Sequence, residues 1–179
     1  MHPDILSVTY SEEAIRQRVS ELGETLARDY GGRSPVFIGI LKGSFVFLAD
    51  LIRAVRVPVE VQFLKASSYG AAAVTSGVVD IDAALPIDIA GRHVLLVEDI
   101  LDTGTTLARL RALLAEKNPA SLKVCAFLDK TACHDASVAA DYAGFDCPVA
   151  FCVGYGLDYA ERYRNLPYIG VLKPEVYGG

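Results

Sequence analysis

Residues 94–107 read VLLVEDILDTGTTL and join a short apolar run to three carboxylates, a turn of small polar residues and the start of a helical pattern. Residues 94–97 are apolar on both faces, which predicts a buried strand. Leu107, Leu110 and Leu114 recur at helical spacing, which predicts a helix after the turn. The stretch therefore predicts a strand, a polar turn and a helix, the repeating unit of α/β proteins.

The segments on either side repeat this alternation. After Ser11, which can cap a helix, apolar residues recur at helical spacing until Gly31 and Gly32. Further strands are expected at residues 36–41, 59–63, 122–128 and 149–153, and a further helix at residues 45–55. Because the strands are mostly apolar on both faces, we expect an α/β fold with a parallel sheet core flanked by helices, in a single domain spanning residues 1–179.

The strand expected at residues 59–63 differs from the others because it alternates. Polar residues separate Val59, Val61 and Phe63, so one face of this strand should be exposed to solvent. Residues 66–77 follow it, and they are almost all small residues, serine and glycine with a single tyrosine. Loops of this length are commonly functional lids or disordered segments, and both alternatives stay open at this point.

Charge and hydropathy exclude several classes of function. A formal net charge of −5 argues against nucleic-acid binding, which depends on basic patches. A phosphorylated ligand would need local donors, a metal ion or a helix terminus. The apolar stretches are far shorter than the roughly 18 residues of a membrane span, and residues 1–10 lack a signal pattern. We therefore expect a soluble, cytoplasmic protein that binds neither nucleic acid nor membrane.

Four cysteines stand at positions 125, 133, 147 and 152, in or beside apolar runs. They lack the paired CxxC spacing of a zinc or redox site. Since free cysteine is among the most buried residue types, core or semi-buried thiols are expected.

The polar end of residues 94–107 has the groups of an anion site. Residues 102–106 combine hydroxyl donors, a glycine that permits close approach and N–H groups at a helix N-terminus. They lack the lysine and the spacing of a GxxxxGK[ST] loop, which favours a monophosphate group. Glu98 and Asp99 offer only acceptors, which suit ribose hydroxyls or magnesium. A plain helix cap with solvated acids is the alternative, and three acids after an apolar strand weigh against it.

This motif resembles the phosphoribosyl pyrophosphate motif of the type I phosphoribosyltransferases. The resemblance implies the fold of that family, with a small hood formed by the terminal segments. Asp102 makes the chain most similar to the hypoxanthine-guanine enzymes, because the 6-oxopurine enzymes carry an acid there and the adenine enzymes a small apolar residue. Two departures from the family pattern are Cys152, where valine is frequent, and Thr105, where some members have lysine.

The resemblance extends along most of the chain. Leu41-Lys42-Gly43 is similar to the family's pyrophosphate loop, and Ser68-Tyr69 to a pair in its mobile lid. Lys130 falls where the family places a lysine against the exocyclic oxygen of the purine. Residues 151–159, FCVGYGLDY, resemble the segment that stacks on the base and supplies a magnesium-binding aspartate. Arg164 matches an arginine that contacts pyrophosphate.

The resemblance implies transfer of phosphoribose from phosphoribosyl pyrophosphate to a 6-oxopurine, hypoxanthine or guanine, with Mg²⁺. Asp102 would be the general base or acid, and the metal would lie near Glu98, Asp99 and Asp158. A homodimer or homotetramer is implied as well. The substrate-binding residues would be Lys42, Gly43, Glu98, Asp99, Ile100, Leu101, Asp102, Thr103, Gly104, Thr105, Thr106, Lys130, Phe151, Cys152, Asp158 and Arg164, with Ser68 and Tyr69 in the lid.

Plainer interpretations exist for several of these residues. Lys42, Lys130 and Arg164 could be surface charges, Phe151 could be core packing, and Asp158 could cap a turn. For the whole protein, the alternatives are a xanthine-preferring phosphoribosyltransferase and a nucleotide-sensing regulatory protein on the same fold. The acid at position 102 and the absence of a basic stripe in the sequence disfavour the regulatory alternative.

Overall fold

The structure is a computed structural model that describes residues 1–67, 80–82, 88–134 and 138–178. Its main sheet consists of β2 (Val36–Leu41), β3 (Glu60–Ser67), β4 (Asp80–Asp82), β5 (His93–Leu101), β6 (Ser121–Asp129) and β7 (Tyr142–Asp146). The strand order is β4-β3-β2-β5-β6-β7, and all neighbours are parallel except β3 and β4. The predicted parallel sheet is thereby confirmed.

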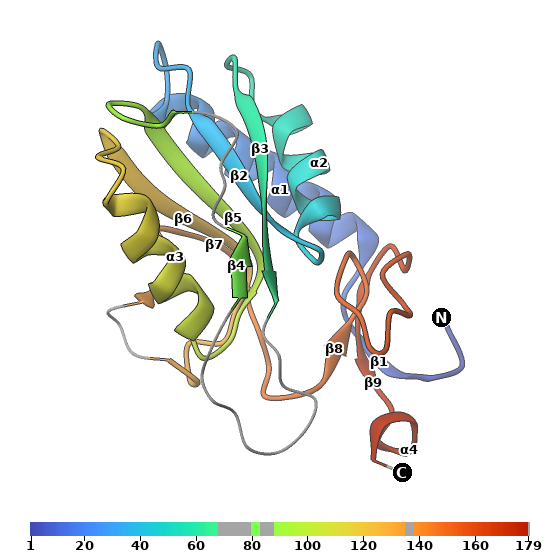
Figure 1. Ribbon diagram of the computed structural model, residues 1–179. Coiled ribbons are helices and arrows are strands. Elements are labelled where there is room, and N and C mark those ends of the chain that lie inside the picture. Colours follow the sequence, from blue (N-terminus) through green and yellow to red (C-terminus); the bar gives the residue numbers. More distant parts are fainter. Residues whose placement is uncertain (68–79, 83–87, 135–137, 179) are drawn as a thin grey trace.

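Helices cover both faces of this sheet (Figure 1). α1 (Glu12–Asp29) and α2 (Phe45–Ala54) pack together on one face, and α3 (Thr105–Ala115) lies on the other. On β2, Phe37 belongs to the core under α1 and α2, and Ile38 to the core under α3. This burial of both faces explains the continuous apolar runs of the central strands. Among the described residues, none of the helices is long and apolar enough to cross a membrane.

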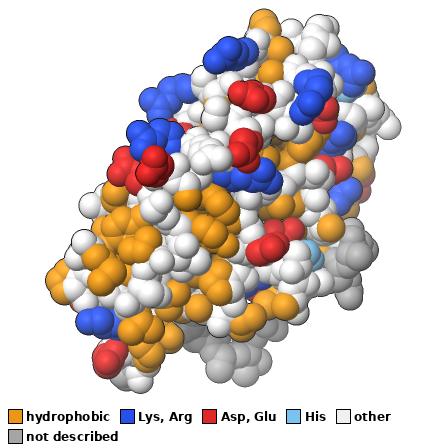
Figure 2. Space-filling view, turned by 180° about the vertical axis from the view of Figure 1, so that it is seen from behind, with side chains coloured by type: hydrophobic (Ala, Val, Ile, Leu, Met, Phe, Trp, Pro, Cys, Tyr) orange, Lys and Arg blue, Asp and Glu red, His pale blue; other side chains and the backbone are white. Residues whose placement is uncertain are grey.

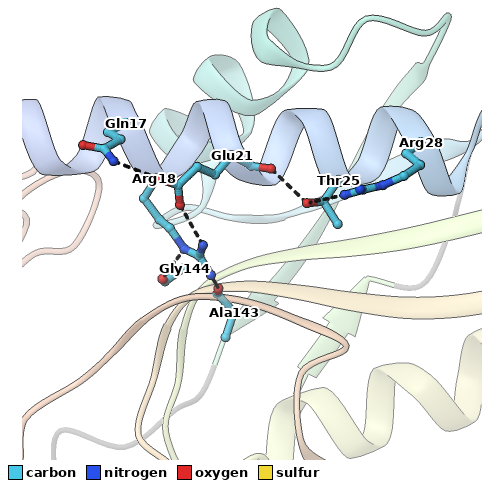
Figure 3. A network of polar contacts seen from close by, with 7 residues as sticks. All are labelled: Gln17, Arg18, Glu21, Thr25, Arg28, Ala143 and Gly144. Carbon is cyan, nitrogen blue, oxygen red and sulfur yellow. Dashed lines mark hydrogen bonds and ion pairs between the residues drawn. The ribbon is translucent and has the colours of Figure 1, made fainter.

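α1 begins at its predicted cap, Ser11, whose side chain accepts a backbone hydrogen bond in the first turn. One turn further on, Arg18 ties the helix to the edge strand β7 (Figure 3). Its Nε donates to the carbonyl oxygen of Gly144 at 2.7 Å, and its Nη2 donates to that of Ala143 at 2.8 Å. Nη1 of Arg18 donates to Oε2 of Glu21 at 2.9 Å. Arg18 therefore satisfies two carbonyl groups of an edge strand and fixes the position of α1.

The terminal segments form a second, antiparallel sheet, the hood, at the lower right of Figure 1. It consists of β1 (Ile5–Tyr10), β8 (Cys152–Val153) and β9 (Ile169–Leu172) in the order β1-β9-β8, followed by α4 (Pro174–Tyr177). Figure 2 shows hydrophobic side chains gathered on this end of the molecule when it is seen from behind. The expected hood of terminal segments is confirmed.

The strand expected at residues 149–153 is wrong in length and in place. Only its last two residues form a strand, which pairs with β9 in the hood, and Val149 is 82% exposed. The last position of the main sheet belongs to β7 instead. β7 has the sequence YAGFD, which is too short and too mixed in polarity for a clear strand pattern.

Two expectations about β3 and the loop after it also need correction. Phe63, expected on a buried face, is 46% exposed and lies over Gly39, whereas Val59 and Val61 pack against the core under α1 and α2. β3 continues to Ser67, so the first two residues of the loop predicted at 66–77 belong to the strand. The rest of that loop, with Ser68 and Tyr69, lies outside the described residues.

The cysteines follow the prediction at three of four positions. Cys125, Cys147 and Cys152 are buried, whereas Cys133 is exposed. The difference arises because Cys133 lies in the turn after β6 and not in a strand.

Candidate active site

A cavity of about 610 Å³ opens at the carboxyl ends of β2 and β5. Ligands of open parallel sheets bind at this edge, so the cavity lies where the fold favours a site. Most of the predicted substrate-binding residues line it. The lining consists of Ile40, Leu41, Lys42, Gly43, Lys65, Glu98, Asp99, Ile100, Leu101, Asp102, Thr103, Gly104, Thr105, Thr106, Leu107, Asp158, Glu161 and Arg164.

The polar turn at residues 102–106 has the backbone of an anion site. Gly104 stands before α3 with a φ of 74° and provides no side-chain cap for the helix. A Cβ atom at this position would lie 2.6 Å from Cγ2 of Val138, so only glycine fits. The hydroxyls of Thr103 and Thr105 lie 3.2 Å apart. Since the residues of this turn line the cavity, its N–H groups and hydroxyls are candidate donors to an anion.

Glu98 and Asp99 belong to the last part of β5, which extends further than predicted. Oε2 of Glu98 is buried and has no hydrogen-bond partner among the described residues. Burial, reinforced by the charge of Asp99, raises the pKa of Glu98 well above its ordinary value. Burial also raises the pKa of Asp99 to about 6, against the effect of two backbone N–H groups. Burial therefore favours the neutral forms of both acids, and Oε2 of Glu98 lacks a partner for its charged form in the described part of the chain.

The pyrophosphate loop predicted at Lys42-Gly43 lies directly against this acid pair. A Cβ atom at Gly43 would lie 1.6 Å from Oδ2 of Asp99, so no other residue fits there without displacing the carboxylate. The same loop contacts the FCVGYGLDY segment, since a Cβ atom at Gly156 would lie 2.2 Å from the carbonyl oxygen of Gly43. Glycines at positions 43 and 156 thus bring three segments of the site together.

Lys130 and Asp102 form an ion pair beside the turn, with Nζ 3.0 Å from Oδ2. The lysine side chain is 17% exposed and the aspartate side chain 51%. Burial alone would lower the pKa of Lys130, but the hydrogen bond and charge of Asp102 more than offset it and the pKa is raised. The backbone N–H of Lys130 also donates to the carbonyl oxygen of Leu101 at 2.9 Å. The ends of β5 and β6 therefore hold the two predicted purine-binding side chains together.

Arg164 organises the part of the cavity where the sequence predicts pyrophosphate binding. Its Nη2 lies 2.8 Å from Oδ1 of Asp158, and its Nη1 donates to the carbonyl oxygen of Gly156 at 2.7 Å. Glu161 accepts from Lys42 at 2.9 Å and from Arg164 at 3.3 Å. Both predicted cations are thus held by acids in the free protein.

Sequence reasoning missed Glu161 and Lys65. Glu161 lies in a segment without periodicity, so no pattern marked it. Lys65 pairs in register with Leu41, which places it at the same edge of the sheet. Only the strand order could have revealed that position.

Lys130, Phe151 and Cys152 lie outside the cavity lining. The Phe151 ring stacks on Tyr177 of α4 with centroids 4.9 Å apart and meets Tyr159 edge-on at 5.4 Å. Cys152 is buried beside Cys147. The structure therefore links Phe151 with the hood.

The acids at the cavity fit a magnesium ion that bridges to a substrate. Carboxylate oxygens are the hard ligands that Mg²⁺ prefers, and Oε2 of Glu98 is without a partner in the described part of the chain. No group of three or more metal-binding side chains occurs among the described residues. Asp158 already accepts from Arg164 and from the backbone N–H of Glu161. This arrangement suits an ion held by one or two carboxylates and by substrate oxygens.

The family model of the phosphoribosyl transferase domain matches residues 9–160, so the chain belongs to the phosphoribosyltransferase family. It is 49% identical over 177 residues to the hypoxanthine-guanine phosphoribosyltransferase of Bacillus subtilis, which covers 99% of this chain and 98% of that protein. A hypoxanthine phosphoribosyltransferase structure from Staphylococcus aureus has a TM-score of 0.94 at 45% identity, covering 100% of this chain and 97% of that one. The bifunctional protein TilS/HprT of Listeria innocua is 47% identical over 177 residues, and this chain spans 27% of its length.

Proposed function

We propose that the protein is a purine salvage enzyme that transfers the 5-phosphoribosyl group of phosphoribosyl pyrophosphate to hypoxanthine or guanine. The products are IMP or GMP and pyrophosphate. The observation that carries this proposal is the ion pair of Lys130 and Asp102 beside the polar turn at residues 102–106. In this proposal the pair supplies a donor and a proton acceptor to a 6-oxopurine, and the turn supplies donors to the ribose phosphate.

The two sides of the cavity suit the two ends of phosphoribosyl pyrophosphate. The turn at residues 102–106 offers backbone and hydroxyl donors to the 5'-phosphate. Lys42 and Arg164, which also line the cavity, suit the pyrophosphate. Glu98 and Asp99 line it as well and would accept from the ribose hydroxyls.

Breaking the bond from C1' to pyrophosphate leaves positive charge on the ribose. The carboxylates of Glu98 and Asp99 would stabilise this charge by electrostatic attraction in a site prepared for it. Bound magnesium would supply neutralising charge to the leaving pyrophosphate. The protein's own contribution is then to position the sugar between the acids and the attacking purine.

Asp102 would accept the proton from N7 of the purine, since it is half exposed to the cavity and carries no second cation besides Lys130 among the described contacts. Lys130 would donate to O6. Purine binding would therefore replace their mutual hydrogen bond with two bonds to the base. A mobile lid of the kind that the family resemblance implies would exclude water as a competing nucleophile.

Pyrophosphate release tests the proposal directly. We expect release with hypoxanthine or guanine in the presence of magnesium, and loss of activity in excess chelator. Asp158→Ala should weaken the magnesium dependence. Activity that is undiminished by excess chelator would contradict the metal requirement. Release with xanthine alone would instead support a xanthine enzyme, and no release with any purine would support a nucleotide-sensing protein.

We also propose that the protein forms a homodimer or homotetramer. Light scattering on the purified full chain measures the subunit number, and a monomer at micromolar concentration would contradict this.

A further inference from the structure

Two buried thiols face each other where the main sheet meets the hood. Cys147 directly follows β7, and Cys152 begins β8. Their exposed fractions are 8% and 7%, and their Sγ atoms lie 3.8 Å apart. The sequence separates them by only four residues, among which Val149 is 82% exposed. The segment between the two thiols is therefore open to solvent at Val149.

The pair lies next to the predicted purine-binding groups. The charge of Lys130 acts on both thiols, and that of Asp102 acts on Cys147. Phe151, the residue expected to stack on the base, immediately precedes Cys152. A chemical change at these sulfurs would thus occur beside the predicted purine-binding groups and not at the polar turn of residues 102–106.

The two thiols are electronically unequal. Cys147 donates a hydrogen bond to Cys152, which lowers the pKa of Cys152, and Lys130 reinforces this effect. The same hydrogen bond raises the pKa of Cys147. Because the thiolate is the reactive form, Cys152 is the nucleophile of the pair and Cys147 its partner.

We propose that Cys147 and Cys152 form a reversible disulfide bond that weakens purine binding. The bond itself follows from the geometry of the two thiols, whereas its effect on purine binding rests on the function proposed above. The oxidant would be a hydroperoxide, and the reductant a small thiol.

The oxidation proceeds in two balanced steps. The Cys152 thiolate attacks a peroxide oxygen, so that an S–O bond forms, the O–O bond breaks and the leaving hydroxide takes a proton to become water. The Cys147 sulfur, losing its proton, then attacks the Cys152 sulfur, so that the S–S bond forms and the second oxygen leaves as water. Overall, two thiols and one hydrogen peroxide give one disulfide and two waters.

Closing this bond constrains the segment that carries Phe151. A disulfide requires an S–S distance of about 2.0 Å, so sulfurs now 3.8 Å apart must approach by roughly 1.8 Å. Cys147 is held by its N–H on the carbonyl oxygen of Asp129 at 2.8 Å. The Phe151 carbonyl oxygen is held by the N–H of Leu172, also at 2.8 Å. Since Phe151 lies inside the closed ring of residues 147–152, the bond restricts the positions that its ring can adopt.

The test uses the full chain with Cys133→Ser, because trypsin releases one peptide, residues 131–162, that contains Cys133, Cys147 and Cys152. In this background, loss of two hydrogens from that peptide after hydrogen peroxide treatment can arise only from the proposed bond. Cys147→Ser in the same background is the matched control, and Cys147→Ala is a second control should serine at this buried position lower stability. Melting temperatures measured before oxidation establish that all variants are folded.

We expect peroxide to form the bond in the Cys133→Ser protein and to lower kcat/KM for hypoxanthine by roughly 10²-fold, with a much smaller change in KM for phosphoribosyl pyrophosphate. A small thiol should restore both mass and activity, and both Cys147 variants should resist the inactivation. Absence of the mass change in folded protein would overturn the proposal, as would a disulfide that leaves hypoxanthine kinetics unchanged. If the reduced protein used no purine at all, the proposed function would fail, while the mass measurement would still decide whether the bond forms.

Discussion

Nζ of Lys130 lies 3.0 Å from Oδ2 of Asp102, so the side chain expected to recognise the purine and the one expected to move its proton are bonded to each other. Each satisfies the other's charge in the free protein. A 6-oxopurine presents an acceptor to the lysine and an N–H to the aspartate, and can therefore replace the bond without leaving either charge unpaired. This exchange links recognition of the base to the start of its chemistry.

Asp102→Asn tests the role of proton transfer. Asparagine keeps the shape of the side chain and can still accept from Lys130, so the fold and the melting temperature should be retained. Turnover should fall by roughly 10²- to 10⁴-fold, because the amide cannot take the purine proton. The measurement is kcat with saturating substrates, with Glu24→Gln on the exposed side of α1 as the control. Unchanged turnover would remove Asp102 from the mechanism.

Gly43→Ala tests the contact between the pyrophosphate loop and the acid pair. The added methyl group would lie 1.6 Å from Oδ2 of Asp99, so the loop or the carboxylate must move. We expect kcat/KM for phosphoribosyl pyrophosphate to fall by roughly 10²-fold or more. Gly31→Ala is the matched control, since a Cβ atom there meets its nearest neighbours at 3.5 Å. Equal activity of the two variants would show that the close approach has no role in binding.

The raised pKa of Asp99 predicts a pH dependence of stability for the protein without ligands. Its pKa is about 6 in the folded protein, against 3.8 for the ordinary carboxyl group. Stability contributed by Asp99 is therefore fully present below about pH 4 and is lost as the pH rises through about 6, by as much as about 3 kcal/mol. Urea unfolding at several pH values between these limits measures the slope of the free energy of unfolding against pH.

Asp99→Asn should flatten that slope, because it removes one titrating acid and also the charge that helps to raise the pKa of Glu98. An equal pH dependence of stability in both proteins would show that Asp99 is not its source. Binding of phosphoribosyl pyrophosphate with magnesium should have the opposite pH dependence, since the bound substrate and metal favour the charged forms of Glu98 and Asp99. Its affinity should rise with pH through about 6, as titration calorimetry can show.

Arg18→Ala tests the attachment of α1 to β7. The variant loses two hydrogen bonds from a charged group to carbonyl oxygens, at 2.7 and 2.8 Å. We expect the free energy of unfolding to fall by about 1.5 to 3 kcal/mol. Arg16→Ala, at an exposed position on the same helix, should change it by less than about 0.5 kcal/mol. Equal effects of the two substitutions would show that the carbonyl contacts in Figure 3 contribute little.

Local sequence predicted the parts of the fold whose signals are local. Residues 94–107 form a strand, turn and helix as expected, because an apolar run and a helical period are both visible within that one stretch. α1 likewise begins at its predicted cap, Ser11. The polar turn at residues 102–106 followed from the same local chemistry.

The hood could not be derived from local pattern, because its strands are defined by distant partners. Ile5 pairs with Leu172, at the other end of the chain, and Cys152 pairs with Val171. The short run at residues 149–153 looked like a strand of the main sheet, since nothing local distinguishes the two sheets. The expectation of a hood came from family resemblance alone. Lys65 was missed for the same reason, because only its pairing with Leu41 brings it to the cavity.

Lys130 carries the last prediction, which concerns choice of base. Its ammonium group has three donors and no acceptor, and only 17% of the side chain is exposed. A 6-oxo group accepts from it. Adenine would present an amino group at the same position, and the resulting contact of donor with donor would leave the lysine with only Asp102 as its partner. Sites built around such a hydrogen bond reject the wrong partner by roughly 10⁴- to 10⁵-fold, and partial access of water reduces this factor.

We therefore expect adenine to react at least about 10³-fold less efficiently than hypoxanthine. Lys130→Ala should reduce that ratio mainly by lowering kcat/KM for hypoxanthine, because the variant loses a donor that adenine never used. Lys123→Ala is a suitable control, since Lys123 lies near the start of the same strand, β6, at the opposite end from Lys130, and donates to the hydroxyl of Tyr142. The measurement is the ratio of kcat/KM values for the two bases in all three proteins. Comparable use of adenine by the unaltered protein would contradict the proposal that Lys130 recognises the 6-oxo group. The same ratio in the Lys130 and Lys123 variants would contradict it as well.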